Sequence, residues 1–365
     1  MVEASPRIRI QNVYWMLAYA FQCLNEGEAK EYSREEFDNL LSLFGRILAN
    51  GLAKQVKQGL SREYRTYTET SGRPRGQILI PETMLNAARH QKLAVCNVDE
   101  YAEDSYPNRI LKSTAMLLSK QPELDETVRR DLLRQLAFFS KVGTADLRHV
   151  SWNRLSYNRN NRSYRMLMAI CRLIIDGMII STDKDKVIRL REYIDDSRMY
   201  DLYEKFLLEF FKRHFPFLSV THSQIDWALG PENRTTDYLP IMQSDLMLSY
   251  KHKTLIIDAK YYEDPLTRRF QGSKPVLHSG NLYQIYTYVN NLDTSSSGDV
   301  SGMLLYIKSD GPSPDADYMM RNNRISAKTL DMDCPFEKIK AQLFALAEGW
   351  LSYALPEESL PSPRA

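Results

Sequence analysis

The segment TLIIDAKYY, residues 254–262, joins a run of β-favouring apolar residues to two residues of opposite charge. Side chains two positions apart in a strand project to the same side, so Asp258 and Lys260 project together while Ala259 packs the other way. A buried strand that ends in two charged residues limits the possible folds, because the fold must supply partners for both buried charges. For an isolated Asp-x-Lys tripeptide, a salt bridge at the strand end is the simpler interpretation.

A hairpin would bring a second carboxylate to Asp258. The upstream segment IMQSDLMLSY carries Asp245, and the link YKHKT joins it to a predicted strand at 253–261. Depending on register, Asp245 can lie beside Asp258, and two adjacent carboxylates repel each other unless a cation lies between them. Mg²⁺ prefers one or two carboxylates with water and phosphate oxygens. The pair therefore predicts a Mg²⁺ site, where Lys260 could orient a water or offset charge on a cleaved phosphodiester.

The flanking helices offer further candidate residues. In the helix predicted from NLYQIYTYVNN, Gln284 and Tyr288 lie one turn apart on one face. In the predicted helix 199–214, Glu204 is a third acid, and a purely structural role for it is an equally good interpretation. Helix, two strands, helix and a strand at 303–308 follow one another here, which predicts an α/β fold with a mixed central sheet.

The first half of the chain has a different pattern. Helical spacing of apolar residues fills the first 50 positions, and alternation then begins near Tyr64. The alternation breaks at SGRPRG and resumes as QILI, so we predict a β-hairpin finger near 62–81 with Arg73 and Arg75 at its exposed tip. The polar stretch STDKDK predicts a boundary near residue 180. The predicted organisation is 1–180, 181–355 and a disordered tail, 356–365.

One stretch has the composition of a nucleic-acid contact, although the net charge of the chain is only +2. Between Asp146 and Asp176 there is no acidic residue, while arginines alternate with aromatic residues. Such a stripe suits phosphate contact and base stacking, and Arg154, Arg159 and Arg162 are the candidates. A solvated basic loop is the alternative interpretation.

Several function classes are disfavoured by the sequence. The four cysteines are scattered, the chain starts without a secretory pattern, and the longest apolar runs are interrupted by charges. These features predict a cytoplasmic protein without a membrane role. The histidines lack zinc-site spacing, and no P-loop pattern occurs, so any nucleotide hydrolysis is expected on another chain.

These motifs together resemble a known family. Asp245, then Asp258-Ala259-Lys260, then Gln284-x-x-x-Tyr288 resemble the PD-(D/E)xK nuclease core in the version that RecB-like nucleases share, with Ser244 where the superfamily name has proline. An ordered series of segments up to about residue 350 is similar to McrC, the family of nuclease subunits of McrBC modified-cytosine restriction systems. The segments are RIRIQNVYWMLAYAF, GRPRGQILIPET, YAEDSYPNRILKSTAMLL, MYDLYEKFLLEFFKRHF, DLMLSYKHKTLIIDAKYY and HSGNLYQIYTYV.

The resemblance implies a Mg²⁺-dependent endonuclease for double-stranded DNA with modified cytosine. Asp245 and Asp258 would be metal ligands, Lys260 the residue that positions water or stabilises the transition state, and Gln284 and Tyr288 its support. Glu204 matches the family's upstream acid less firmly.

The resemblance also implies a partner, a McrB-like AAA+ GTPase hexamer whose GTPase the chain stimulates. Residues 1–180 would dock on this ring, with Arg73 and Arg75 at the contact, and 181–355 would form a restriction-endonuclease-like domain. Two alternatives stay open: a free-standing RecB-like DNA repair nuclease, and a non-cleaving adaptor that activates a AAA+ GTPase.

Overall fold

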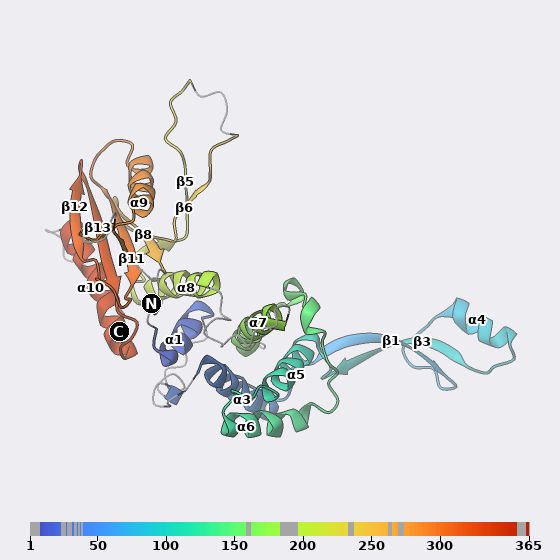
Figure 1. Cartoon of the computed structure of the whole chain (residues 1–365). Coiled ribbons are helices and arrows are strands. Elements are labelled where there is room, and N and C mark those ends of the chain that lie inside the picture. Colours follow the sequence, from blue (N-terminus) through green and yellow to red (C-terminus); the bar gives the residue numbers. More distant parts are fainter. Residues whose placement is uncertain are drawn as a thin grey trace. The chain divides into compact units, whose positions relative to one another are not determined.

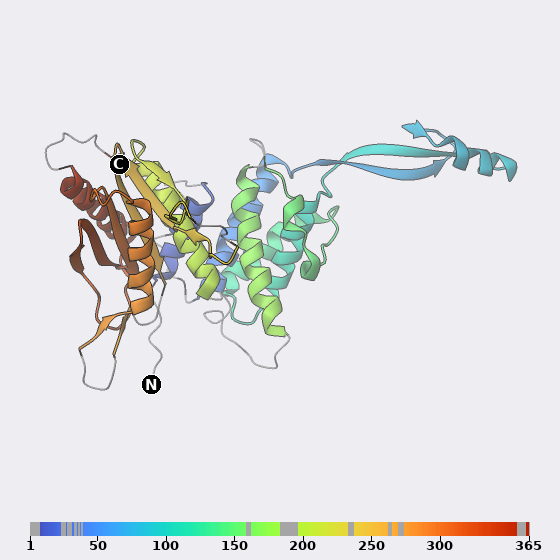
Figure 2. The same ribbon diagram turned by 90° about the horizontal axis from the view of Figure 1, so that it is seen from above.

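The chain divides into two compact units in a computed structural model (Figures 1 and 2). The sheet unit consists of residues 1–37 and 194–365, and the arm unit consists of residues 38–193. The structure describes residues 8–22, 27, 31–32, 35, 37, 39–157, 162–182, 196–232, 237–261, 265–268, 274–355 and 363–364.

A six-stranded mixed sheet forms the centre of the sheet unit, in the strand order β12-β13-β11-β8-β7-β4. The strands β8, β11 and β13 are parallel, and β4, β7 and β12 pair antiparallel at the two sides. The predicted mixed sheet flanked by helices is therefore confirmed. The elements are α1 (Ile10–Ala20), α8 (Asp196–His214), β4 (Ser219–Thr221), β5 (Gln224–Ile225), β6 (Met242–Gln243), β7 (Leu246–Tyr250), β8 (Lys253–Lys260), β9 (Leu266–Thr267), β10 (Val276–Leu277), α9 (Ser279–Leu292), β11 (Val300–Ile307), β12 (Ala316–Met320), β13 (Asn323–Leu330) and α10 (Phe336–Ala354).

Helices α9 and α10 cover opposite faces of this sheet (Figure 2). Ile285 and Val289 of α9 pack in one core with Ile256 and Leu304, whereas α10 faces the alternate residues, such as Met303. Because side chains alternate along a strand, Asp258 and Lys260 lie on the α9 face with Ile256. The apolar packing of α9 thus fixes one wall of the predicted site.

The N-terminal helix α1 belongs to the sheet unit, which differs from the predicted first domain of 1–180. Asn12 is buried and its side-chain amide donates hydrogen bonds of 2.8 Å to the carbonyl oxygens of Met332 and Cys334. Trp15 stacks on Phe336 with ring centroids 4.1 Å apart. The helical periodicity of α1 is confirmed, but the partners of Asn12 and Trp15 lie more than 300 residues away, where no local pattern indicates them.

The arm unit combines a helical body with a long antiparallel ribbon, the arm. Leu43, Leu48, Leu111 and Leu132 are among the fully buried residues of the body. The elements are α3 (Leu40–Gln58), β1 (Glu63–Ser71), β2 (Gln77–Ile78), α4 (Ile80–Ala88), β3 (Ala94–Ala102), α5 (Tyr106–Ser119), α6 (Glu126–Leu136), α7 (Arg162–Thr182) and three short 3₁₀ helices at Ala137–Phe139, Leu147–His149 and Trp152–Arg154.

The arm corrects the predicted finger at 62–81. Strand β1 pairs over its whole length with β3, from Glu63 opposite Ala102 to Ser71 opposite Ala94, and β2 lies on the other edge of β3. The pairing predicted across SGRPRG is wrong, because only two residues of β2 precede α4, which has proline in its first turn. Strand β3 has nine residues that can pair with β1, against two in β2, so β1 pairs with β3.

The tip of the arm, residues 72–93, contains α4 (Figure 1) and carries exposed apolar side chains. Helix α4 has no buried residue. Gly76 has φ +77° and lies so close to β3 that a Cβ atom there would be 2.2 Å from the Asn97 carbonyl oxygen, so this turn requires glycine. The exposed apolar side chains are those of Ile78, Ile80, Met84, Leu85 and Leu93.

Two further predictions concern the chain as a whole. Of the predicted disordered tail 356–365, only residues 363–364 are described, and Arg364 donates its backbone N–H to the His214 carbonyl oxygen at 2.7 Å. The remainder of that prediction lies outside the described residues. Among the helices that the structure describes, none combines the length and the apolar character that a bilayer-spanning helix needs.

Candidate active site

The β7–β8 hairpin brings Asp245 to Asp258. The last pair of this hairpin is Leu246 opposite Ile257, and continuing the register by one residue places Asp245 opposite Asp258. Only residues 251–252 separate the strands, so the connection is tighter than the predicted five-residue link. The hairpin predicted from the sequence is confirmed, and its register is the one that places both carboxylates at the same end of the sheet.

Asp258 and Lys260 are a buried pair of opposite charges. The two residues are 0% and 5% exposed, and Lys260 Nζ lies 2.6 Å from Asp258 Oδ2. Asp258 Oδ1 has no hydrogen-bond partner among the residues the structure describes. Burial raises the pKa of Asp258 to about 7, with Lys260 opposing the rise and Asp245 adding to it. The carboxylate is therefore costly to ionise unless more positive charge is supplied.

Asp245 is held by two hydrogen bonds to the same oxygen. Its Oδ2 accepts from the backbone N–H of Ala259 at 2.7 Å and from the Tyr200 hydroxyl at 3.1 Å. Burial and the charge of Glu204 raise the pKa of Asp245 to about 7, although its hydrogen bonds and the charge of Lys260 act in the other direction. The two donors fix the plane of the carboxylate against the end of β8.

A hydrogen-bond chain connects Lys260 to α9. The ammonium group of Lys260 donates to Gln284 Oε1, and Gln284 Nε2 donates to the Tyr288 hydroxyl oxygen, each at 3.0 Å. Tyr288 is only 8% exposed and packs in the core of the α9 face. The structure therefore brings together Asp245, Asp258, Lys260, Gln284 and Tyr288, as the sequence spacing indicated.

Glu204 lies beside the two aspartates, on α8. Burial raises the pKa of its carboxyl group, and hydrogen bonding with Tyr200 and Asp245 opposes this. Tyr200, one turn before Glu204, was not identified from the sequence. The signal was present, since positions 200 and 204 share one helix face at i,i+4 spacing.

The donor set fits a hard divalent cation. Two facing carboxylates, one with an oxygen that lacks a hydrogen bond, match the ligands that Mg²⁺ takes from protein. No cluster of three or more acidic, histidine or cysteine side chains arranged to bind a metal is present in the described part of the chain. Asp245 and Asp258 are thus the cation ligands that the geometry supports, and a role for Glu204 stays a prediction.

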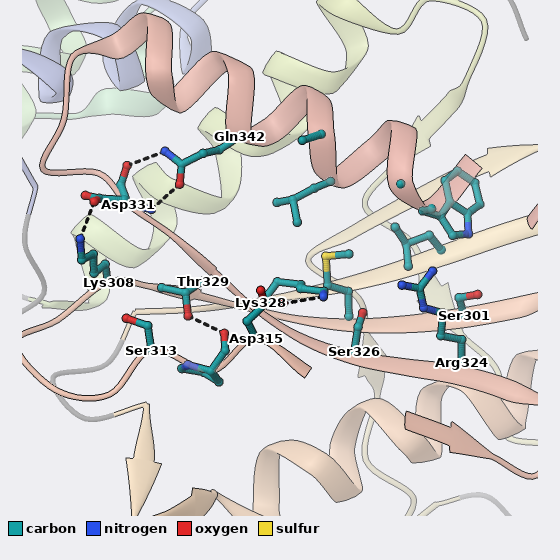
Figure 3. A pocket seen from close by; sticks show the side chains of 17 residues that line it. Ser301, Lys308, Ser313, Asp315, Arg324, Ser326, Lys328, Thr329, Asp331 and Gln342 are labelled. Carbon is teal, nitrogen blue, oxygen red and sulfur yellow. Dashed lines mark hydrogen bonds and ion pairs between the residues drawn. The ribbon is translucent and has the colours of Figure 1, made fainter. Parts of the chain in front are cut away.

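A cavity of about 530 Å³ lies on the other face of the sheet, between the strands and α10 (Figure 3). Ion pairs line its rim, Lys308 with Asp331 and Lys328 with Asp315, each with 2.6 Å between nitrogen and oxygen. Because its charged groups already pair with one another, we place the chemistry at the β7–β8 end, where the carboxylates are short of partners.

The predicted binding arginines lie in the arm unit. The Arg154 guanidinium lies 5.5 Å from the centre of the Tyr106 ring, while Arg159 and the side chain of Arg162 lie outside the described residues. At the arm tip, Arg73 is exposed and Arg75 Nη2 lies 3.0 Å from Glu69 Oε2 of β1. No geometry in the structure assigns these residues to a partner or to DNA, so both roles stay predictions.

Comparisons with known proteins identify a family, a relative and a fold. Residues 2–307 match the family described as McrBC 5-methylcytosine restriction system component. The type IV methyl-directed restriction enzyme EcoKMcrBC of Escherichia coli K12 is 30% identical over 305 residues, 82% of this chain and 86% of the relative. The fold is similar, with a TM-score of 0.58 and 17% identity, to a chain in the refined half-complex from the tetradecameric assembly of Thermococcus gammatolerans McrB AAA+ hexamers with bound McrC. That match covers 93% of this chain and 75% of the other.

Proposed function

Because this chain belongs to the family of McrBC 5-methylcytosine restriction system components, we propose that it is the DNA-cleaving subunit of a GTP-dependent restriction complex. The observation that carries the proposal is the meeting of Asp245, Asp258 and Lys260 at one end of the β7–β8 hairpin. A pair of carboxylates with an adjacent lysine is the side-chain set of a PD-(D/E)xK endonuclease. We therefore assign the sheet unit to that nuclease class.

Asp245 and Asp258 would hold Mg²⁺, as their facing register and raised pKa values favour. When bound, the cation supplies positive charge that stabilises the phosphodiester oxygens as negative charge builds on them. Asp258 would serve as a ligand because its Oδ1 has no hydrogen-bond partner among the residues that the structure describes. The fixed Oδ2 of Asp245 keeps the second carboxylate in place while DNA enters.

Lys260 is the residue that acts on the reacting groups. Its ammonium contacts both Asp258 and Gln284, and from this position it would donate to water or to the cleaved phosphate. Gln284 and Tyr288 limit where it can point, because they form a hydrogen-bonded chain anchored in the core. This arrangement supports orientation of the nucleophile and stabilisation of the transition state.

The arm is the proposed contact with a McrB-like AAA+ GTPase hexamer. The relative of similar fold is bound to McrB AAA+ hexamers, and the arm presents arginines and apolar side chains together at its tip. An exposed apolar surface rimmed by charge is typical of a protein-binding site. We propose that Arg73, Arg75 and the apolar side chains of α4 contact the partner and stimulate its GTPase.

Contact with double-stranded DNA is the remaining part of the proposal. Arg154, Arg159 and Arg162 belong to a segment without acidic residues, and such arginines contact phosphates independently of sequence. Recognition of the modified cytosine is assigned to the partner.

The test is plasmid cleavage by the chain reconstituted with its partner, GTP and Mg²⁺, on DNA with and without 5-methylcytosine. Asp245→Ala, Asp258→Ala and Lys260→Ala are each expected to abolish cleavage while partner binding is kept. Asp299→Ala is the matched control, because it breaks the 2.7 Å ion pair with Lys253 at the other end of β8 and is expected to cleave normally.

The same assay separates the alternatives. Full activity of Asp258→Ala would remove the nuclease assignment. Cleavage without partner and GTP would favour a free-standing nuclease, and GTPase stimulation without any cleavage by the wild-type chain would favour an adaptor.

A further inference from the structure

Tyr200 reaches the candidate site from α8, the helix that also carries Glu204. Its hydroxyl donates to Asp245 Oδ2 at 3.1 Å, the oxygen that also accepts from the Ala259 N–H. Tyr200 is half-buried, and its helix neighbours Met199 and Tyr203 are buried. The ring is therefore fixed by the packing of α8, and the hydroxyl arrives at Asp245 from a rigid element.

Asp245 needs such a contact because it lies just outside the strand ladder. Strand β7 begins at Leu246, and the backbone before it is held by the loop, since the Ser244 N–H donates to the Ser223 carbonyl oxygen at 3.0 Å. These contacts fix the backbone and leave the carboxylate free to rotate about its own bonds. A single hydrogen bond to Asp245 Oδ2 would still allow the carboxylate to rotate about that bond. Two donors from different elements, the Ala259 N–H and the Tyr200 hydroxyl, fix the plane of the carboxylate.

We propose that Tyr200 is the positioning residue of Asp245, holding its carboxylate plane so that the remaining oxygen faces a divalent cation shared with Asp258. The inference rests on the proposed function only in taking Asp245 as a cation ligand. Donors that hydrogen-bond to a ligating group orient it and commonly change metal affinity when they are removed. Tyr200 itself touches neither DNA nor the reacting atoms in this assignment.

The same helix provides a matched control in Tyr203. This tyrosine is fully buried three residues after Tyr200, and its hydroxyl has no hydrogen-bond partner among the described residues. Replacing either tyrosine with phenylalanine removes one hydroxyl oxygen and keeps the ring. Only the Tyr200 substitution removes a bond to Asp245.

The experiment compares Tyr200→Phe, Tyr203→Phe and wild type as full-length chains. Mn²⁺ binding is measured by electron paramagnetic resonance titration, and cleavage by the reconstituted complex is measured over a range of Mg²⁺ concentrations. Tyr200→Phe is expected to raise the Mn²⁺ dissociation constant roughly tenfold and to shift the half-saturating Mg²⁺ concentration by a similar factor, with the rate largely restored at high Mg²⁺. Tyr203→Phe is expected to match wild type in both.

A double variant checks that the effect passes through Asp245. In an Asp245→Ala background, Tyr200→Phe is expected to cause no further loss of Mn²⁺ binding, because the group it positions is absent. A folded Tyr200→Phe chain with wild-type Mn²⁺ binding and Mg²⁺ dependence overturns the inference and leaves the nuclease proposal standing. Altered Mn²⁺ binding in a chain that never cleaves DNA supports the positioning role and removes the nuclease proposal. Absence of Mn²⁺ binding to wild type overturns the inference.

Discussion

At the end of the β7–β8 hairpin two charged side chains are buried, whereas at the tip of the arm apolar side chains are exposed. Asp258 and Lys260 are 0% and 5% exposed, while Ile80 and Met84 are 66% and 67% exposed. Each arrangement disfavours the isolated chain, because buried charges lose hydration and exposed apolar groups order water. Each would be relieved by the ligand proposed for it, a cation in the first region and a protein surface in the second. The comparison teaches that burial of charge and exposure of apolar groups both point to ligands outside the chain.

The largest expected effect comes from removing the apolar surface at the arm tip. We expect Ile80→Ser, Met84→Ser and Leu85→Ser together to weaken partner binding by at least about 100-fold, since buried apolar anchors dominate such interfaces. Stimulated GTP hydrolysis and cleavage should fall with it, while the unfolding temperature stays unchanged because these side chains are exposed. Binding is measured by titrating the chain into the partner and recording GTP turnover.

A comparison variant at the tip replaces the turn, residues 72–75, with glycine and serine, which removes the arginines and keeps Gly76 and α4. It is expected to weaken partner binding less than the apolar variant does. A superimposable turnover curve for the apolar variant and wild type would contradict the comparison. It would place partner docking elsewhere on the chain.

The next effect concerns the stability of the metal-free sheet unit. A carboxyl group whose folded pKa is raised to about 7 destabilises the fold once it ionises, so this cost is absent near pH 4 and grows as pH rises toward 7. We expect Asp245→Asn to raise the free energy of unfolding by about 1 to 2 kcal/mol at pH 8 and by much less at pH 5. Urea unfolding in EDTA at both pH values measures this. An equal effect at both pH values would show that the raised pKa of Asp245, caused first by burial and then by the charge of Glu204, is not the source of the instability.

A smaller effect tests whether the arm unit also contacts DNA. We expect Arg154→Gln, Arg159→Gln and Arg162→Gln together to weaken DNA binding for all sequences alike and to flatten its salt dependence, by up to about one unit of log-log slope per lost phosphate contact. Fluorescence anisotropy over a salt series measures the slope. An unchanged slope would favour the interpretation of this segment as a solvated basic loop and would leave the arm unit without a DNA contact from these arginines.

The smallest expected effect is that of Arg75. Its side chain is exposed and that of its partner Glu69 is half-buried, and such surface pairs contribute little to stability. We expect Arg75→Gln to leave the unfolding temperature unchanged and to lower partner affinity only a few-fold, mainly through the association rate. Stopped-flow association at two salt concentrations measures this. A loss of partner affinity as large as that of the apolar variant would show that charged contacts, and not the apolar surface, dominate partner binding.

Much of the candidate site was predictable because its geometry is local. Strand period and helical spacing place Asp258 beside Lys260 and Gln284 beside Tyr288, and the hairpin connection allows Asp245 to lie beside Asp258 in one register, which the structure shows. Tyr200 could not be assigned in the same way, because its contact depends on how α8 packs against the hairpin. The cation itself stays an expectation from the chemistry of the carboxylates.

The fold was predictable where pairing is short-range and failed where it is not. Strand β1 was paired with the nearest alternating segment, yet it pairs with β3 across the inserted α4. Strands β12 and β13 and helix α10 were not identified from the sequence, although β13 lies next to β11 at the centre of the sheet. Pairing across an insertion depends on the relative lengths of competing strands, which local periodicity does not reveal.

The hydrogen bonds of Asn12 have a consequence for synthesis of the protein. Asn12 and Met332 are 320 positions apart, and at roughly 5 to 20 residues per second the second follows the first from the ribosome by roughly 15 to 60 seconds. The whole arm unit is translated within that interval, so it can fold while α1 still lacks its partners. Strand β13 is also made late, and any nascent or truncated chain that ends before it lacks one of the central strands of the sheet. Translation order therefore completes the arm unit before the sheet unit.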